Sequence, residues 1–285
     1  MALQQFKPLL WSRRFIVNVD KALVFPQVVD TSYEGEIQSG QVLKINEIGN
    51  INVSDYSTTG GVTWQDLDDA QKELVIDQKK YFAFAIDDAD AAQMNVSVMD
   101  GAMRKAAHAV GDTIDQFIAG KYAEAGITNA SNLGSATSRK QLYAKDMPDL
   151  LTYMLRYLKE ANAIGTPWCV APPWFMQLLR YAQITTGGSQ TFDSPNAPGL
   201  TSDAVYGMGF RFYESNNVST DGTTTRIMFG TSDAIAYAGQ VSKVEAVRRE
   251  SFFADGVKGL YIYGAKVARP DHLGVVYASM DGLTT

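Results

Sequence analysis

The spacing of apolar positions changes once along the chain, near residue 88. Before this point, apolar residues of one parity recur every second position, which places them on one face of an extended strand. They are Leu74, Ile76, Phe82, Phe84 and Ile86. After it, apolar residues recur at spacings of three and four, the pattern of one helix face. They are Met99, Met103, Ala106, Val110, Ile114 and Phe117. The pattern therefore predicts a long strand that passes almost directly into a long helix.

The predicted helix covers residues 88–122 and would be roughly 50 Å long at 1.5 Å per residue. Asp87 and Asp88 stand where the strand gives way to the helix, so their carboxylates are expected to cap its first turn. Three glycines, Gly101, Gly111 and Gly120, fall inside the predicted helix and indicate bending or close backbone contacts. A rod of this kind is typical of a structural protein.

The segment before the long strand predicts an extended hairpin. Apolar points between residues 41 and 57 indicate an outgoing strand, residues 58–61 (TTGG) form a turn or flexible tip, and the chain returns from about Lys72. A lone two-stranded hairpin of this length is marginally stable in water. We therefore expect it to lie on a partner surface.

The first 45 residues are rich in large apolar side chains without a sustained period, and Pro8 and Pro26 interrupt them. Two interpretations remain open from the sequence. These residues form a short helix and strands at the edge of a core, or they form an arm that buries its apolar side chains against a neighbouring subunit.

The second half predicts a separate unit. GITNASNLGSATS (residues 126–138) has the composition of a linker, and a helix follows with Asp146 as its cap and Pro148 in its first turn. Residues 168–171 form a short buried strand, Pro172 and Pro173 open another helix, and residues 185–201 form a long irregular loop. Further strands are expected at residues 209–217, 226–230, 243–250, 259–270 and 274–280, with FFADGVKG (residues 252–259) as a turn.

Composition narrows the functional classes. The 285 residues carry a formal net charge of -6, which argues against a surface built to neutralise a phosphate backbone. Cys169 is the single cysteine, so neither an intrachain disulfide nor a cysteine-based zinc site is expected. No run of eighteen apolar residues occurs and no signal-peptide core is present, so we expect no membrane segment.

No motif in the sequence carries recognisable chemistry. His108 lies in the predicted helix without a second histidine four residues away, and His272 follows a Pro-Asp pair in an expected loop. Two acidic groups could ligate a divalent cation but lack the EF-hand pattern, and caps or solvated loops are the simpler interpretation. They are Asp87, Asp88 and Asp90, and Asp66, Asp68 and Asp69. No nucleophile elbow, P-loop or dinucleotide fingerprint occurs. We therefore predict no enzyme activity and no catalytic, cofactor-binding or metal-binding residues.

Several segments, taken in order, resemble the major capsid proteins of tailed double-stranded DNA bacteriophages, which have the Hong Kong 97-like fold. LVIDQKKYFAFAIDDADAAQ is similar to the returning strand of that family's extended loop and the start of its spine helix. VAPPWFMQLL resembles a strand and proline-started helix of the axial domain, and GFRFYESNN resembles an axial-domain strand. FFADGVKGLYIYGAKVARPDHL is similar to the C-terminal part of the fold.

The resemblance implies an α+β, Hong Kong 97-like fold. Its expected parts are an N-terminal arm (residues 1–45), an extended β-hairpin loop (46–80), a peripheral domain with the spine helix (81–145), an axial domain (146–245), and C-terminal strands (246–285) that return to both domains. The arm and the loop would reach across neighbouring subunits.

The resemblance also implies a function. Copies of the chain would assemble into pentamers and hexamers of an icosahedral head that encloses double-stranded DNA without sequence-specific binding. The expected partners are copies of itself, a separate scaffolding protein, a portal and, as an optional addition, a decoration protein. The protein would be assembled in the cytoplasm of a bacterial host and reside in the virion capsid.

Two alternatives belong to other classes. An encapsulin-type nanocompartment shell resembles the same fold and stores cargo enzymes. A hydrolase whose site is assembled from distant residues is the more remote alternative, because histidines are few and catalytic motifs are missing.

Overall fold

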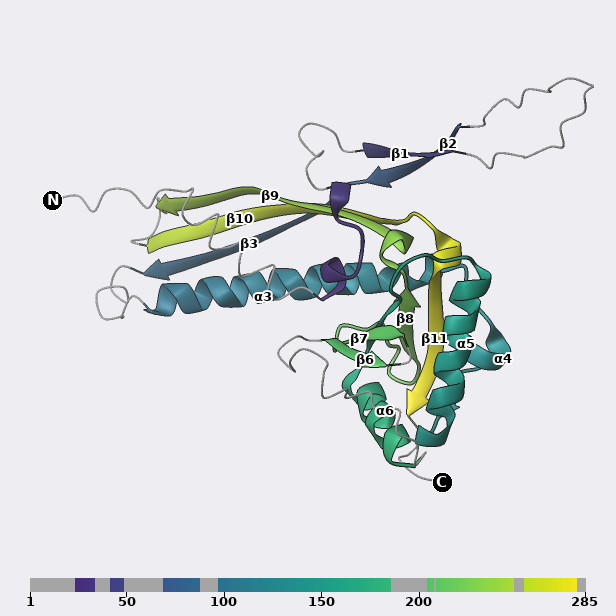
Figure 1. Ribbon diagram of the computed structural model, residues 1–285. Helices are drawn as coiled ribbons and strands as arrows, with labels where there is room; N and C mark the ends of the chain where they lie inside the picture. Colours follow the sequence, from purple (N-terminus) through teal and green to yellow (C-terminus); the bar gives the residue numbers. More distant parts are fainter. Residues whose placement is uncertain are drawn as a thin grey trace, which may run out of the picture.

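The computed structural model describes residues 24–33, 42–48, 69–87, 97–185, 204–207, 209–248 and 254–280. They form an elongated part, a rounder part, and a two-stranded hairpin that projects from the elongated part (Figure 1). The predicted α+β class is confirmed, because helices and three β-sheets share the chain.

The elongated part is a three-stranded antiparallel sheet with a long helix against one face (Figure 1). The strand order is β3 (Gln78–Asp87), β10 (Ala254–Val267) and β9 (Ile235–Arg248), and the helix is α3 (Ser97–Ala119). Alternate side chains of β10 are buried toward the helix, and the rings of Phe117 and Tyr263 meet edge to face at 5.3 Å. The alternating apolar residues of the strands and the apolar face of the helix thus pack in one layer.

The rounder part is built on a six-stranded mixed sheet. Its strand order is β4 (Lys140–Leu142), β11 (Leu273–Met280), β8 (Thr225–Gly230), β5 (Trp168–Ala171), β7 (Phe210–Glu214) and β6 (Ala204–Gly207). Three helices pack against this sheet through a second apolar cluster: α4 (Ala130–Leu133), α5 (Met147–Glu160) and α6 (Pro173–Thr185). All four side chains of β5 are buried, as expected for a strand in the middle of a covered sheet.

The hairpin consists of β1 (Val42–Ile48) and β2 (Asp69–Val75), paired antiparallel from Val42 opposite Val75 to Ile48 opposite Asp69. The predicted excursion is confirmed for this base. The single long strand predicted over residues 71–86 is wrong, because Ile76 and Asp77 separate β2 from β3, and the two strands belong to different sheets. The shared parity still holds, since Leu74 and Ile76 are buried and Phe82 and Phe84 pack on the core.

Residues 24–33 decide part of the question left open for the N-terminal segment. A 3-10 turn, η1 (Phe25–Gln27), buries Phe25 in the main core with Val28 and Val29. Asp30 then exchanges backbone hydrogen bonds with β9, donating to Ile235 and accepting from Tyr237. This stretch therefore packs at the edge of its own subunit's core. Residues 1–23 lie outside the described part.

The long helix is confirmed as an α-helix over Ser97–Ala119, and a 3-10 turn, η3 (Gly120–Glu124), follows it. The sequence predicted Gly120 inside the α-helix. This position is wrong, because Gly120 begins the 3-10 turn that follows the helix. The expected start at Asp88 lies outside the described residues. Asp146 is the N-cap residue of α5, as predicted, but its side chain makes no capping hydrogen bond.

Two predicted connections are wrong. Residues 126–138 are not a loose linker: Ile127 bridges Gly274 of β11, Asn129 caps α4, and Leu133 is fully buried. The turn predicted at residues 252–259 is strand from Ala254 onward, because β10 pairs with β3 from Ala254 to Tyr263 and with β9 from Asp255 to Val267. In both places tertiary pairing overrides a polar, glycine-containing composition.

Candidate assembly surfaces

The base of the hairpin has one face on its own subunit and one face exposed. Leu74 packs with Leu43 and Ile45 against Ala236 and Ala238 of β9. Lys72 Nζ also donates to the carbonyl oxygen of Ala268 at 2.7 Å. The opposite face carries the cross-strand pair of Val42 and Val75, both exposed. The base of the hairpin is therefore anchored to its own subunit.

The loop carried by this base is acidic. Residues 49–68 contain three aspartates, Asp55, Asp66 and Asp68, and no lysine or arginine. Residues 49–68 lie outside the described part, so the charge is known here from the sequence. A partner surface for this loop should be cationic.

The face of the three-stranded sheet that points away from α3 fits this requirement. It presents Lys79, Lys243 and Lys258, all exposed, around the Tyr81 side chain, which is 79% exposed. The single carboxylate among them, Glu245, pairs with both Lys243 and Lys258. Hydrogen bonds from these lysines lower the pKa of Glu245 below its usual value.

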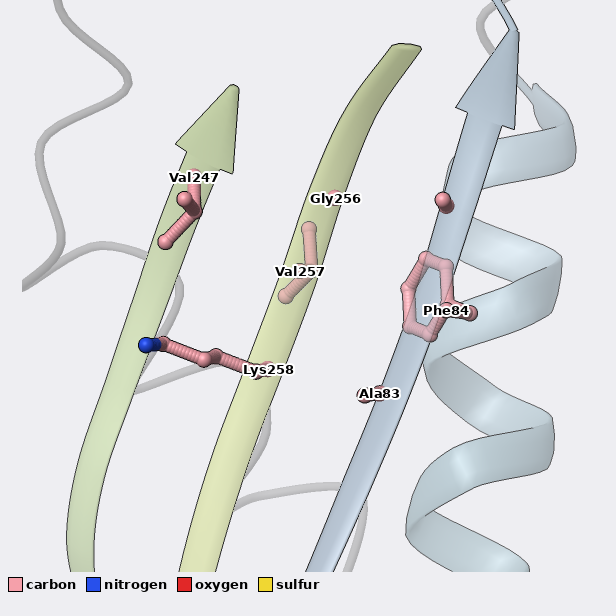
Figure 2. A pocket seen from close by; sticks show the side chains of 7 residues that line it. Ala83, Phe84, Val247, Gly256, Val257 and Lys258 are labelled. Atoms are coloured by element: carbon pink, nitrogen blue, oxygen red, sulfur yellow. The ribbon is translucent and has the colours of Figure 1, made fainter. Parts of the chain in front are cut away.

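A shallow groove of about 410 Å³ runs along the same sheet near its far end. Gly256 of β10 has no side chain, and this leaves a gap with Ala83 and Ala85 of β3 on one side and Val247 of β9 on the other. The side chain of Lys258 lies at the edge of the groove and extends toward β9 (Figure 2). An exposed apolar groove beside lysines is suited to a segment that carries both apolar and acidic side chains.

The two chain segments that cross between the sheets meet at Asp233. It lies on η5 (Ser232–Ala234), which leads from β8 to β9, while η6 (Pro270–His272) leads from β10 to β11. One carboxylate oxygen of Asp233 is 2.9 Å from both Arg269 Nη1 and His272 Nδ1, and the other accepts from Thr231 Oγ1. Burial opposes ionisation of Asp233, but these partners outweigh it and hold its pKa below the usual value.

His272 therefore has a partner that the sequence did not reveal, 39 residues away. The pair does not form a catalytic arrangement, because the Thr231 hydroxyl donates to Asp233 and not to the imidazole. Its role is to join η5 to η6. A histidine and an aspartate at this separation leave no local pattern in the sequence.

The other candidate residues stay apart. His108 is an exposed side chain on α3 paired with Asp112, and Cys169 is buried in β5, where burial raises the pKa of its thiol. Within the described residues, no three His, Cys, Asp or Glu side chains converge on a metal-sized site. The side chains of Asp66, Asp68, Asp69, Asp87, Asp88 and Asp90 lie outside the described part. No helix in the described ranges is long and apolar enough to span a membrane.

A family model described as "Phage capsid protein" matches residues 71–278, which include both sheets and the long helix. The chain belongs to the phage capsid protein family. It is thus a structural major capsid protein, a self-assembling subunit of a virion shell. The family match favours this function over the encapsulin-type alternative. Among curated proteins, no match was found.

Solved structures agree with this placement. A structure from Mycobacterium phage Che8 is 28% identical with a TM-score of 0.68, and covers 97% of this chain and 94% of that one. The capsid structure of cyanophage P-SCSP1u is 16% identical with a TM-score of 0.64, covering 99% and 91%. A virus-like particle from Pyrococcus furiosus is 11% identical with a TM-score of 0.57, covering 93% and 97%. The latter two show the shared fold, and the predicted Hong Kong 97-like fold of the capsid protein is confirmed.

Proposed function

We propose that copies of this capsid protein form hexamers and pentamers that close into an icosahedral head around double-stranded DNA. We further propose that the acidic loop of one copy docks on the lysine-bearing sheet face of the next. The observation that carries this proposal is the charge match: three aspartates without a cation in residues 49–68, and three exposed lysines around Tyr81 on the sheet.

The docking proposal rests on two surfaces, the hairpin and the lysine-bearing sheet face, that each gain from being covered. Among the described residues, the hairpin is anchored at its base, and a two-stranded ribbon gains stability when a second surface covers it. The sheet face holds an exposed tyrosine and an apolar groove that water would otherwise fill. Joining the two surfaces buries apolar area and pairs opposite charges, and the charges fix orientation more than affinity.

The sheet organisation supports the proposed division of the subunit. Residues 1–45 serve as an arm, 46–80 as the extended loop, 81–145 with the spine helix α3 as the peripheral domain, and 146–245 as the axial domain, with 246–285 returning to both. The pairing of β9 with β10 favours a boundary near residue 234 over the one at residue 245. At residue 234 the chain leaves the six-stranded sheet and enters the three-stranded one.

The remaining partners and roles follow the same proposal. A separate scaffolding protein, a portal and an optional decoration protein complete the head, which is assembled in the cytoplasm of a bacterial host. The net charge of -6 suits a wall that encloses DNA without binding its sequence. The subunit serves as a building block, without a catalytic, cofactor or metal site.

A charge-swap experiment tests the docking. The double variant Lys243→Glu/Lys258→Glu should lower the yield of shells seen by electron microscopy at least tenfold, because three carboxylates would then face the acidic loop. Adding Asp66→Lys/Asp68→Lys to the same chain should restore shells. Lys159→Glu, an exposed cation at the end of α5, is the control and should assemble normally.

The outcomes separate two failures. If the wild-type chain, co-expressed with its scaffold, forms no shell, the assembly function itself is wrong. If the wild type assembles and the sheet double variant does too, the lysine face is not the docking surface. Loss of shells without rescue by the loop changes would also contradict the pairing.

A further inference from the structure

A buried carboxylate lies where the N-terminal segment meets the spine helix. Asp115 of α3 is 1% exposed, in the same apolar layer as Ile114 and Ile118. Its Oδ1 accepts hydrogen bonds from the backbone N–H groups of Val24, at 3.3 Å, and Phe25, at 3.2 Å. These donors lie about ninety positions earlier in the chain. Asp115 is therefore a direct tie between two distant segments.

The bonded N–H groups are those that open the turn η1. Its N-cap residue, Val24, supplies no side-chain cap, so Asp115 fills the role of a capping carboxylate from another element. Without Asp115 both N–H groups would be left in the core, and an unsatisfied buried donor is costly. The neighbouring Phe25 ring is fully buried and adds apolar anchorage at the same point.

A third part of the subunit reaches the same carboxylate. Asn217, in the connection between β7 and β8, hydrogen-bonds Asp115 and also donates to Asp112 Oδ1 at 3.0 Å. Asp112 is the charged group that faces Asp115 among the described residues, and its other oxygen is 3.1 Å from His108 Nδ1. The arm root, the spine helix and the axial-side loop thus converge on one buried acid.

We propose that Asp115 is a proton-sensitive anchor for the root of the N-terminal arm, held by residues 24–29, and that its ionisation loosens the arm from the spine helix. The anchor fixes the position of Val24 against the spine helix. It does not depend on what that chain then contacts.

The direction of the effect follows from the environment of the carboxyl group. Burial raises the pKa of Asp115 to about 6, with a smaller rise from Asp112, against the lowering effect of the hydrogen bonds from Phe25, Val24 and Asn217. Release of the arm exposes the carboxyl and returns its pKa to the ordinary range near 3.9. Docking is then tightest below about pH 4 and weakens as pH rises through about 6. Linkage gives a roughly tenfold weaker docking at pH 7 than at pH 5.

Hydrogen exchange of the full-length subunit measures the pH dependence of arm docking directly. After correction for the intrinsic pH dependence of exchange, the opening constant of amides 24–29 should increase roughly tenfold between pH 5 and pH 7. Asp115→Asn keeps an acceptor oxygen but cannot ionise, so this increase should vanish. His108→Gln, which alters an exposed side chain one helical turn from Asp112, is the control and should keep this increase.

Asn217→Ala provides a second variant that leaves Asp115 in place. Loss of this donor should raise the pKa of Asp115 further and shift the midpoint of arm opening to higher pH. A wild-type opening constant that is the same at pH 5 and pH 7 would overturn the proposal. So would a pH dependence that survives Asp115→Asn or disappears in His108→Gln. All these opening constants are measured on the isolated subunit, so their outcome is independent of the shell-assembly tests.

Discussion

Asp233 is a single side chain on which the relative placement of the two sheets depends. Replacing it with alanine removes the shared acceptor of Arg269 and His272, and leaves the His272 imidazole, 12% exposed, without its partner. We expect Asp233→Ala to lower the free energy of unfolding by about 1–2 kcal/mol, since the Arg269 pair is solvent-screened and contributes little. Urea titration followed by circular dichroism would measure it.

The same residue predicts a pH signature of opposite sign to that of Asp115. The lowered pKa of Asp233 means that its ionised form stabilises the fold above about pH 4, and that this contribution is lost as pH falls through the folded pKa. The difference in stability between wild type and Asp233→Ala should therefore shrink in acid. Arg156→Ala, which removes an exposed ion pair with Glu160, is the control and should leave the stability almost unchanged. An equal loss of stability in Asp233→Ala and Arg156→Ala would show that Asp233 does not stabilise the contact between η5 and η6.

The side-chain hydrogen bonds of Asp115, Asp233 and His272 could not be predicted from the sequence. The sequence placed His272 in a loop without a partner and gave Asp115 no role, because each makes its contacts with segments 39 or about ninety positions away. Hydrogen bonds between such distant positions depend on how the elements pack, which local spacing does not encode.

At the scale of elements, Gly264 fixes where the hairpin crosses the long sheet. A Cβ at this position of β10 would overlap the Val75 carbonyl oxygen and lie 2.9 Å from Ile76 Cα. Both are backbone atoms that no rotamer change can move aside. Gly264→Ala should therefore lift the base of the hairpin from the body and expose Leu74, at a cost of about 1–3 kcal/mol.

Limited proteolysis and hydrogen exchange over Asp69–Val75 would detect this movement as faster cleavage and faster exchange. Gly120→Ala is the matched control, because nothing lies within 4 Å of its added methyl group. It should be neutral or stabilise the subunit by up to about 1 kcal/mol. Unchanged protection of β2 in Gly264→Ala would show that the hairpin base is not held at this point.

Elements with a strong period were predictable from the sequence, and those defined by pairing were not. The parity of Leu74 and Phe82 and the helical spacing from Met103 to Phe117 gave correct faces, because one buried layer imposes both patterns. The break after Val75 was missed, since a change of sheet leaves the alternation intact. The packed segment around Leu133 was missed because its glycines and serines resemble a linker until a partner strand covers them.

For the whole molecule, the described residues form two large apolar cores and a smaller third cluster under the base of the hairpin. Leu43, Ile45 and Leu74 hold this base on β9 of the same subunit. Folding and assembly should therefore be separable. The assembly role could be predicted from the family resemblance. The sequence could not identify the surface that we propose receives the loop, because this surface combines β3 with β9 and β10, which lie far from β3 in the chain.

Deletion of residues 52–67 tests this separation. Ile48 and Asp69 remain paired, and the four residues left between them can close a short hairpin turn. The variant should keep its helical circular dichroism and its unfolding midpoint to within a few degrees, since the pairing of β1 with β2 and their packing on β9 remain. Shells should be absent by electron microscopy, because each copy then lacks most of the loop that we propose docks on its neighbour. Normal shells from this variant would contradict the loop's part in assembly, whereas an unfolded product would show that the loop stabilises the subunit itself.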